Sequence, residues 1–125
     1  MAKRILCIED ERFISELYAR ALKHAGYEVT TIIDGEDGLH EAVSGKYDVI
    51  LLDIMLPTMN GVDMLYKMKD DRVRPKMDSK IIITTNLEQK EEIRKKVEQM
   101  ADGYLIKAEI TPKELVQYVA QVLGS

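Results

Sequence analysis

Two apolar runs that each end in acids are the segments of this sequence best suited to chemistry. Residues 5–8 (Ile-Leu-Cys-Ile) lead into Glu9 and Asp10, and residues 48–52 (Asp-Val-Ile-Leu-Leu) lead into Asp53. Runs rich in Ile, Leu and Val predict strands buried on both faces, as in a parallel sheet. Because the ligands of such sheets bind beyond the carboxyl ends of the strands, we expect the three acids to meet at one edge.

A divalent cation is the expected partner of these acids. Three converging carboxylates repel one another unless a cation lies among them. A hard ion with oxygen ligands, Mg²⁺ above all, meets this need. Glu9, Asp10 and Asp53 therefore predict a magnesium site, and such a site is suited to phosphoryl transfer.

Short apolar runs alternate with longer amphipathic ones along the whole chain, which predicts an α/β fold. Strands are predicted at residues 4–8, 28–32, 48–52, 80 to 84 or 85, and 103–106. Helices are predicted between them, including 36–43 and 88–100, and after the last strand. Right-handed crossovers then give a doubly wound (βα)5 sandwich of the flavodoxin-like type, with strand order 2-1-3-4-5. The switch point of this order lies between the first and third strands, whose ends carry the acids.

The helices have predictable faces and ends. An apolar stripe at spacings of three and four, from Phe13 to Ala25, predicts the inner face of the first helix, and Gly26 predicts its end. Thr111 followed by Glu114 predicts a capping box at the start of the last helix. The inner face of the third helix is predicted to consist of Val62, Leu65 and Met68.

The bulk composition narrows the class of protein. A chain of 125 residues that is 46% hydrophobic predicts one folded domain, residues 1–125. The net charge of −4 argues against direct nucleic-acid binding, and no apolar run reaches the ~20 residues of a membrane span. No signal peptide is recognisable, which predicts a cytoplasmic protein. The lone Cys7 is expected to be a small buried hydrophobe, and His24 and His40 are expected at the surface.

Four segments, in order, resemble the CheY-like receiver domain of two-component response regulators. They are the acidic pair within residues 5–11, the Pro- and Gly-containing loop 53–61, the hydroxyl-bearing segment 84–86, and the segment 103–107 that ends in lysine. Together they are spread along the chain in the order expected for one complete domain. The resemblance implies a signalling switch that is phosphorylated on an aspartate and that, unlike an enzyme, catalyses only its own phosphoryl transfer and dephosphorylation.

Each site residue takes its role from this resemblance. Asp53 matches the phosphoacceptor, whose carboxylate attacks a phosphoryl group and becomes an acyl phosphate. Asp10 and Asp53 match direct ligands of Mg²⁺, Glu9 matches a ligand that acts mostly through water, and the backbone carbonyl of Met55 adds a further oxygen. Lys107 matches the lysine that contacts the phosphoryl oxygens or pairs with the unphosphorylated aspartate.

Two further residues match the switch of the family. Thr85 is preferred over Thr84 as the switch hydroxyl because the spacing to Lys107 suits it and because alternation along a strand points only one of the two at the site. Thr84 is then expected to face the core or a helix. Tyr104 matches the switch aromatic, whose ring moves inward when the hydroxyl turns to the phosphoryl group.

The resemblance also implies partners. A sensor histidine kinase or phosphotransfer protein is expected to donate the phosphoryl group. The expected output is the face formed by helix 88–100, strand 103–106 and the last helix, acting on a downstream protein, on a fused output domain, or in a phosphorylation-dependent homodimer. Exposed residues expected on this face are Lys90, Arg94, Lys95, Tyr104 and Gln117. Whether the chain is a stand-alone receiver or part of a longer regulator is left open.

Three positions depart from the family pattern. Ala108 replaces a proline that usually follows a cis bond, so a trans bond is expected after Lys107. The replacement favours one alternative, a pseudo-receiver that acts as a phosphorylation-independent scaffold. Apolar Met55 and Leu87 stand where other members orient the attacking water, which predicts slow self-dephosphorylation. Met55 also argues against an aspartate-based phosphatase, which needs an acid two residues after its nucleophile.

Overall fold

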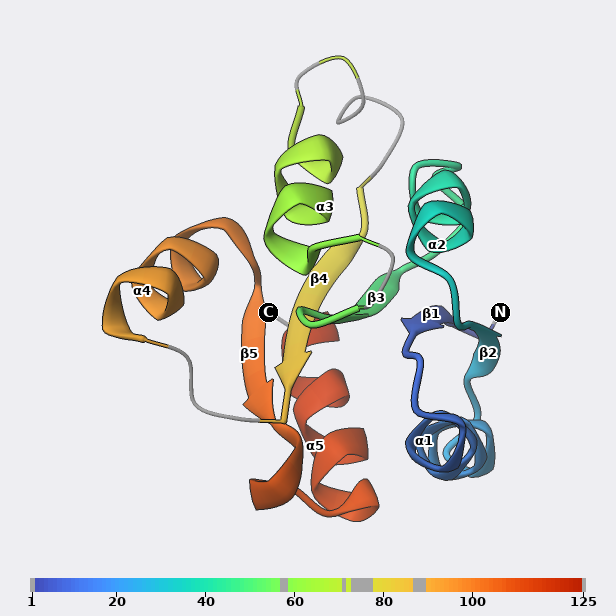
Figure 1. Cartoon of the computed structure of the whole chain (residues 1–125). Coiled ribbons are helices and arrows are strands. Elements are labelled where there is room, and N and C mark those ends of the chain that lie inside the picture. The colour runs from blue at the N-terminus through green and yellow to red at the C-terminus, as the bar shows by residue number, and fades with distance from the viewer. Residues whose placement is uncertain (1, 57–58, 71, 73–77, 87–89, 125) are drawn as a thin grey trace.

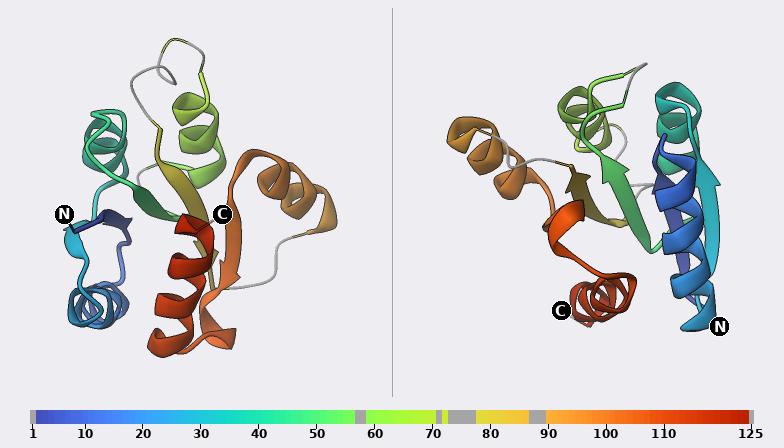
Figure 2. Two further views of the ribbon diagram at one scale, coloured as in Figure 1. Left: turned by 180° about the vertical axis from the view of Figure 1, so that it is seen from behind. Right: turned by 60° about the horizontal axis from the view of Figure 1, so that its bottom comes forward.

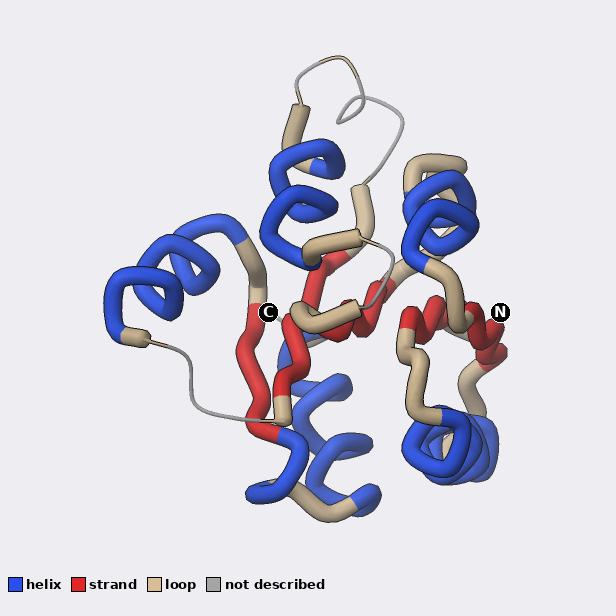
Figure 3. Tube along the Cα trace, viewed as in Figure 1, coloured by secondary structure: helices blue, strands red, loops and turns tan. Residues whose placement is uncertain are grey.

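Five parallel strands form the centre of the molecule (Figure 1). The computed structural model describes residues 2–56, 59–70, 72, 78–86 and 90–124. The strands are β1 (Arg4–Ile8), β2 (Glu28–Ile32), β3 (Val49–Asp53), β4 (Lys80–Thr85) and β5 (Gly103–Ile106). The helices are α1 (Arg12–His24), α2 (Gly35–Ala42), α3 (Gly61–Met68), α4 (Glu91–Met100) and α5 (Pro112–Leu123). Figure 3 shows how strands and helices alternate along the chain.

The sheet order is β2-β1-β3-β4-β5, which confirms the predicted doubly wound topology. All four pairings are parallel, and Ile8 lies opposite Leu52 in the register of β1 and β3. The carboxyl ends of β1 and β3 therefore lie side by side. This is the point at which the chain reverses direction across the sheet and where ligands of such folds bind.

Alternate residues of the strands build two separate hydrophobic cores, one on each face of the sheet. On one face, Ile5 and Val49 pack with residues of α1 and α5, such as Leu22 and Leu115. On the other face, the alternating strand residues pack with α2, α3 and α4. In Figure 1, α1 and α5 lie below the sheet and α2 and α3 above it, and the views in Figure 2 agree. Because both faces are covered, β1 and β3 consist almost wholly of apolar residues.

The element boundaries follow the local signals closely. Thr111 and Glu114 form the predicted capping box at the start of α5, and Gly26, at φ 102°, follows the end of α1. Strand β3 begins and ends one residue later than predicted, so Asp53 is its last residue. Helix α4 begins at Glu91, and the earlier start predicted at position 88 lies outside the described residues.

The inner face of α1 was predicted correctly at Tyr18 and Leu22 but wrongly at Phe13. Phe13 is 75% exposed, whereas Ser15, Tyr18, Ala19 and Leu22 are the buried residues of the helix. Small side chains at 15 and 19 allow the helix to approach the sheet closely on that side, which turns Phe13 toward solvent. On α3, Met64 joins Leu65 and Met68 in the core, and Val62 is only half-buried. Among the described residues, the helices are too short or too polar to cross a membrane.

Candidate functional site: an acidic pocket with a buried lysine

The predicted site residues are carried by the carboxyl ends of three strands. Glu9 follows β1, Asp53 ends β3, and Lys107 follows β5. By alternation, Glu9 continues the row of Ile5 and Cys7, and Asp53 continues the row of Val49 and Leu51, on the face that α1 and α5 cover. The hydrophobic residues that fix these rows therefore also aim both carboxylates at the same place.

The three acids meet as predicted. One carboxylate oxygen from each of Glu9, Asp10 and Asp53 lies within 4.8 Å of the others. Glu9 and Asp53 are buried, with 1% and 2% of their surfaces exposed, whereas Asp10 is half-buried. The cluster thus lies under the surface, and Asp10 is its most accessible member.

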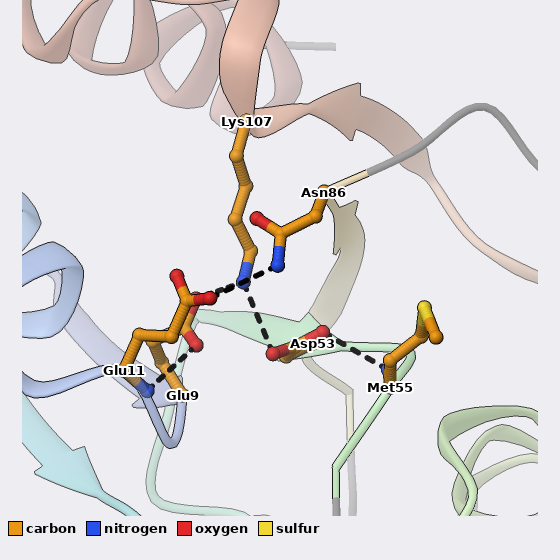
Figure 4. Close-up of polar contacts among 6 residues, drawn as sticks. All are labelled: Glu9, Glu11, Asp53, Met55, Asn86 and Lys107. Carbon is orange, nitrogen blue, oxygen red and sulfur yellow. Dashed lines mark hydrogen bonds and ion pairs between the residues drawn. The ribbon is translucent and has the colours of Figure 1, made fainter.

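Lys107 lies between two of the acids (Figure 4). Its ammonium forms an ion pair with Glu9 Oε1 and donates a hydrogen bond to Asp53 Oδ2 at 3.0 Å. The side chains of all three residues are at least 97% buried. A charge buried to this extent is tolerated only when it is paired, so Lys107 and the two carboxylates hold one another in place.

Backbone N–H groups orient the two buried carboxylates. The N–H of Met55 donates to Asp53 Oδ1 at 3.0 Å, and the N–H of Glu11 donates to Glu9 Oε2 at 3.1 Å. Each carboxylate therefore has one oxygen held by its own loop and the other facing Lys107. This arrangement presents Asp53 in a fixed orientation, as a nucleophile requires.

The electrostatics of the pocket show a shortage of positive charge. Burial, reinforced by the charge of Asp53, raises the pKa of Glu9 to about 7, although Lys107 partly opposes this. Burial also raises the pKa of Asp10, as do its hydrogen bond and charge interaction with Asp53. Burial alone would lower the pKa of Lys107, but the carboxylates of Glu9 and Asp53 outweigh it and raise that pKa. One ammonium is thus too little to neutralise the three acids.

The donor set suits a hard divalent cation. Three carboxylates and one ammonium leave two negative charges when all are ionised, which a divalent ion would balance. Among the described residues, Glu9 Oε1 is the buried side-chain oxygen that accepts no hydrogen bond of regular geometry, and its neighbour is the ammonium of Lys107. Oxygen ligands of this kind fit Mg²⁺, as the sequence predicts.

The two threonines at the end of β4 are both buried and lie on opposite faces of the sheet. Thr84 is paired in register with Asp53. Thr85 follows Ile81 and Ile83 on the face that packs against α2, α3 and α4, which is also the face against which Tyr104 packs. The alternation used in the sequence prediction is therefore present, but it places Thr84 on the same face as Asp53 and Thr85 on the opposite face, together with Tyr104. The role of Thr85 as the switch hydroxyl stays a prediction.

Tyr104 and Arg94 are less exposed than predicted. Tyr104 and Arg94 are half-buried because the Arg94 guanidinium lies 5.1 Å from the centroid of the Tyr104 ring. The other three residues expected at this surface are exposed: Lys90, Lys95 and Gln117.

The loop after β5 confirms one departure from the family pattern. The Lys107–Ala108 bond is trans, as predicted. Residues Lys107–Glu109 form a 3-10 turn, closed by a hydrogen bond from Ile110 N–H to the Lys107 carbonyl at 3.4 Å. This turn begins at Lys107 itself and directs its side chain into the pocket.

One contact of the site was missed in the sequence. Asn86 donates a hydrogen bond from its side chain to Glu11 Oε1 at 3.0 Å (Figure 4). Glu11 is the N-cap residue of α1 and makes no side-chain cap. The sequence signal that could have indicated this contact is the position of Asn86, which directly follows β4 at the edge of the sheet where the acids lie. Met55 is 58% exposed, and Leu87 lies outside the described residues.

Comparison with known proteins agrees with this geometry. The family model of the response regulator receiver domain matches residues 5–120. The response regulator ArlR of Staphylococcus aureus (strain Mu50 / ATCC 700699) is 33% identical over 119 residues, 95% of this chain and 50% of its own. The chain thus spans about half the length of the curated relatives it matches.

Comparison with solved structures also identifies receiver domains as similar proteins. A CheY-like receiver domain protein from Methanospirillum hungatei JF-1 has a TM-score of 0.83 and 29% identity, covering 99% of this chain and 95% of its own. The chemotaxis response regulator CheY4 of Vibrio cholerae has a TM-score of 0.84 and 26% identity, covering 98% and 99%. With its sheet order, acidic pocket and buried lysine, the chain belongs to the response regulator receiver domains, the phosphorylation-dependent signalling domains of two-component systems.

Proposed function

We propose that Asp53 is the phosphoacceptor of this receiver domain and that a sensor histidine kinase or phosphotransfer protein is the donor. The observation that carries the proposal is the pairing of a buried, oriented aspartate with a buried ammonium at 3.0 Å. Asp53 is the one residue of the acidic cluster that both ends a strand and contacts Lys107 and a backbone N–H.

In the proposed transfer, a carboxylate oxygen of Asp53 attacks phosphorus and the P–N bond of the donor phosphohistidine breaks. The bonding electrons return to the imidazole nitrogen, and an acyl phosphate forms on Asp53. Lys107 then moves its ammonium from the aspartate to a phosphoryl oxygen, where its charge offsets the added negative charge. The N–H of Met55 keeps the carboxylate oriented throughout.

Glu9, Asp10 and Asp53, with the backbone carbonyl of Met55, would hold Mg²⁺. When bound, the ion supplies positive charge to the phosphoryl oxygens and balances the two negative charges that Lys107 leaves in the pocket. Without it, a phosphoryl group would enter a site that is already too negative. We therefore expect phosphorylation to depend on a divalent cation.

The proposed output is the face formed by α4, β5 and α5. The new phosphoryl oxygens attract the hydroxyl of Thr85, and this biases a two-state equilibrium in which Tyr104 moves inward. Tyr104 and Thr85 lie toward the same face of the sheet, which supports their coupling. The target is a downstream protein, a fused output domain or a second copy of the chain.

Phosphorylation by acetyl phosphate tests the proposal without the cognate kinase. The protein is incubated with acetyl phosphate and Mg²⁺, and its intact mass is measured. We expect the mass to increase by one phosphoryl group. This increase should be absent in EDTA and in Asp53→Asn. It should persist in Asp63→Asn, the matched control, which changes an exposed acid on α3. A protein that gains no phosphoryl group under these conditions would instead be the phosphorylation-independent scaffold.

A further inference from the structure

The side chain of Tyr118, on α5, reaches the backbone of β5. Its hydroxyl oxygen accepts a hydrogen bond from the N–H of Tyr104 at 3.2 Å. Strand β5 lies at the edge of the sheet and pairs only with β4. A backbone N–H on the open side of an edge strand needs a partner other than the sheet, and Tyr118 supplies it here.

Gly103 makes this contact sterically feasible. A Cβ atom built at position 103 would lie 2.6 Å from the Tyr118 hydroxyl oxygen and 2.8 Å from a ring carbon. A Cβ atom is essentially never found this close to such atoms, so a larger residue would displace the ring. Gly103 and Tyr118 are therefore a matched pair, in which the missing side chain of one makes room for the ring of the other.

Tyr104 is consequently held by two helices at once. Arg94 of α4 lies over its ring at 5.1 Å, and Tyr118 of α5 holds its backbone. Arg94 is itself fixed by an ion pair with Glu98 at 2.8 Å. The Tyr118 ring borders two surface cavities of about 210 and 250 Å³, which leave it space to shift with the strand.

We infer that Tyr118 is a positioning residue that couples α5 to the switch aromatic Tyr104. A displacement of β5 at Tyr104 moves the backbone N–H that donates its hydrogen bond to the Tyr118 hydroxyl. Through this hydrogen bond the displacement reaches α5. This inference rests on the proposed function, since it takes Tyr104 as the switch. It adds a structural connection through which α5, one helix of the output face, responds to a displacement of β5.

Amide hydrogen exchange in the unphosphorylated protein tests the contact by itself. Tyr118→Phe keeps the ring and removes the acceptor, so the Tyr104 amide should exchange faster by about fivefold, the factor for a hydrogen bond of about 1 kcal/mol. The matched control is Tyr66→Phe, which changes an exposed tyrosine on α3 and should leave that amide unaffected. An unchanged exchange rate at Tyr104 in Tyr118→Phe would overturn the inference.

The coupling is tested by NMR with beryllium trifluoride, a tetrahedral mimic of the phosphoryl group. In the wild type, amide shifts should change near Asp53, at Tyr104 and along α5. In Tyr118→Phe the changes near Asp53 should persist and those in α5 should shrink by half or more. Equal α5 changes in both proteins would overturn the inference. A wild type with no response near Asp53 would contradict both the proposed function and its coupling to α5, whatever the exchange result.

A double-mutant cycle separates the contact from general damage to β5. Gly103→Ala should lower the urea midpoint of unfolding in the wild type, because the new Cβ collides with Tyr118. In a Tyr118→Ala background the same change should lower the midpoint far less, since the ring is absent. Equal shifts in the two backgrounds would show that Gly103 and Tyr118 do not act as a pair.

Discussion

Replacing Lys107 by methionine should reveal how strongly the pocket depends on positive charge. The side chain of methionine is similar in length but carries no charge. It would leave two buried carboxylates, Glu9 and Asp53, without their ammonium. Removing one partner of a buried ion pair costs about 3–5 kcal/mol. We expect the lower end, about 3 kcal/mol in EDTA at neutral pH, because Glu9, with a pKa of about 7, takes up a proton at little cost.

Magnesium should reverse most of this loss. A ligand at 100 times its Kd stabilises the folded state by about 2.7 kcal/mol. The more negative pocket of Lys107→Met should bind the ion more tightly than the wild type does, so the difference in stability should narrow in Mg²⁺.

Urea unfolding followed by circular dichroism measures both effects, with an unchanged slope confirming that only stability has altered. The matched control is Lys113→Met, which removes an exposed ammonium on α5 and should change stability by no more than about 0.5 kcal/mol. The reasoning is refuted if the two variants lose equal stability in EDTA, or if Mg²⁺ leaves the gap between them unchanged.

Three further outcomes follow from the same structure. The folded-state pKa of Glu9, about 7, lies above its ordinary 4.5, so ionised Glu9 destabilises the metal-free protein as pH rises through this window. The stability of Glu9→Gln relative to that of the wild type should therefore rise by about 3 kcal/mol as the pH is raised from about 4 to about 8. A stability difference that does not change with pH would contradict this. Gly61→Ala should lower stability by at least about 2 kcal/mol, because its Cβ would lie 2.4 Å from the Cα of Ile54; an unchanged thermal midpoint would argue against that close approach. Finally, Met55→Asn combined with Leu87→Glu should speed the decay of the phosphorylated form in Mg²⁺, measured by intact mass, since both changes add groups that can orient water; an unchanged decay would count against slow self-dephosphorylation.

The strands and their order were predictable because burial on both faces leaves few choices of residue. β1 and β3 are continuous apolar runs for this reason, and the acids that end them can only lie at the edge of the sheet. The convergence of Glu9, Asp10 and Asp53 therefore follows from topology alone.

Contacts that depend on side-chain length and helix rotation were not predictable. The ion pair between Lys107 and Glu9 requires the turn at 107–109 to direct a long side chain across the pocket. The exposure of Phe13 arises because Ser15 and Ala19 are small enough to pack against the sheet, which a count of apolar residues does not anticipate. The Tyr118 contact depends equally on what Gly103 lacks.

The phosphorylated residue itself can be identified chemically, and this tests the central claim most directly. An acyl phosphate is reduced by borohydride to an alcohol, so phosphorylated protein treated with borohydride carries homoserine at the acceptor position. Tryptic cleavage after Lys46 and Lys67 gives a peptide that contains Asp48, Asp53 and Asp63. We predict homoserine at position 53 alone after treatment with acetyl phosphate and Mg²⁺. Homoserine at either of the other two aspartates, or in another peptide, with position 53 unmodified, would contradict the account.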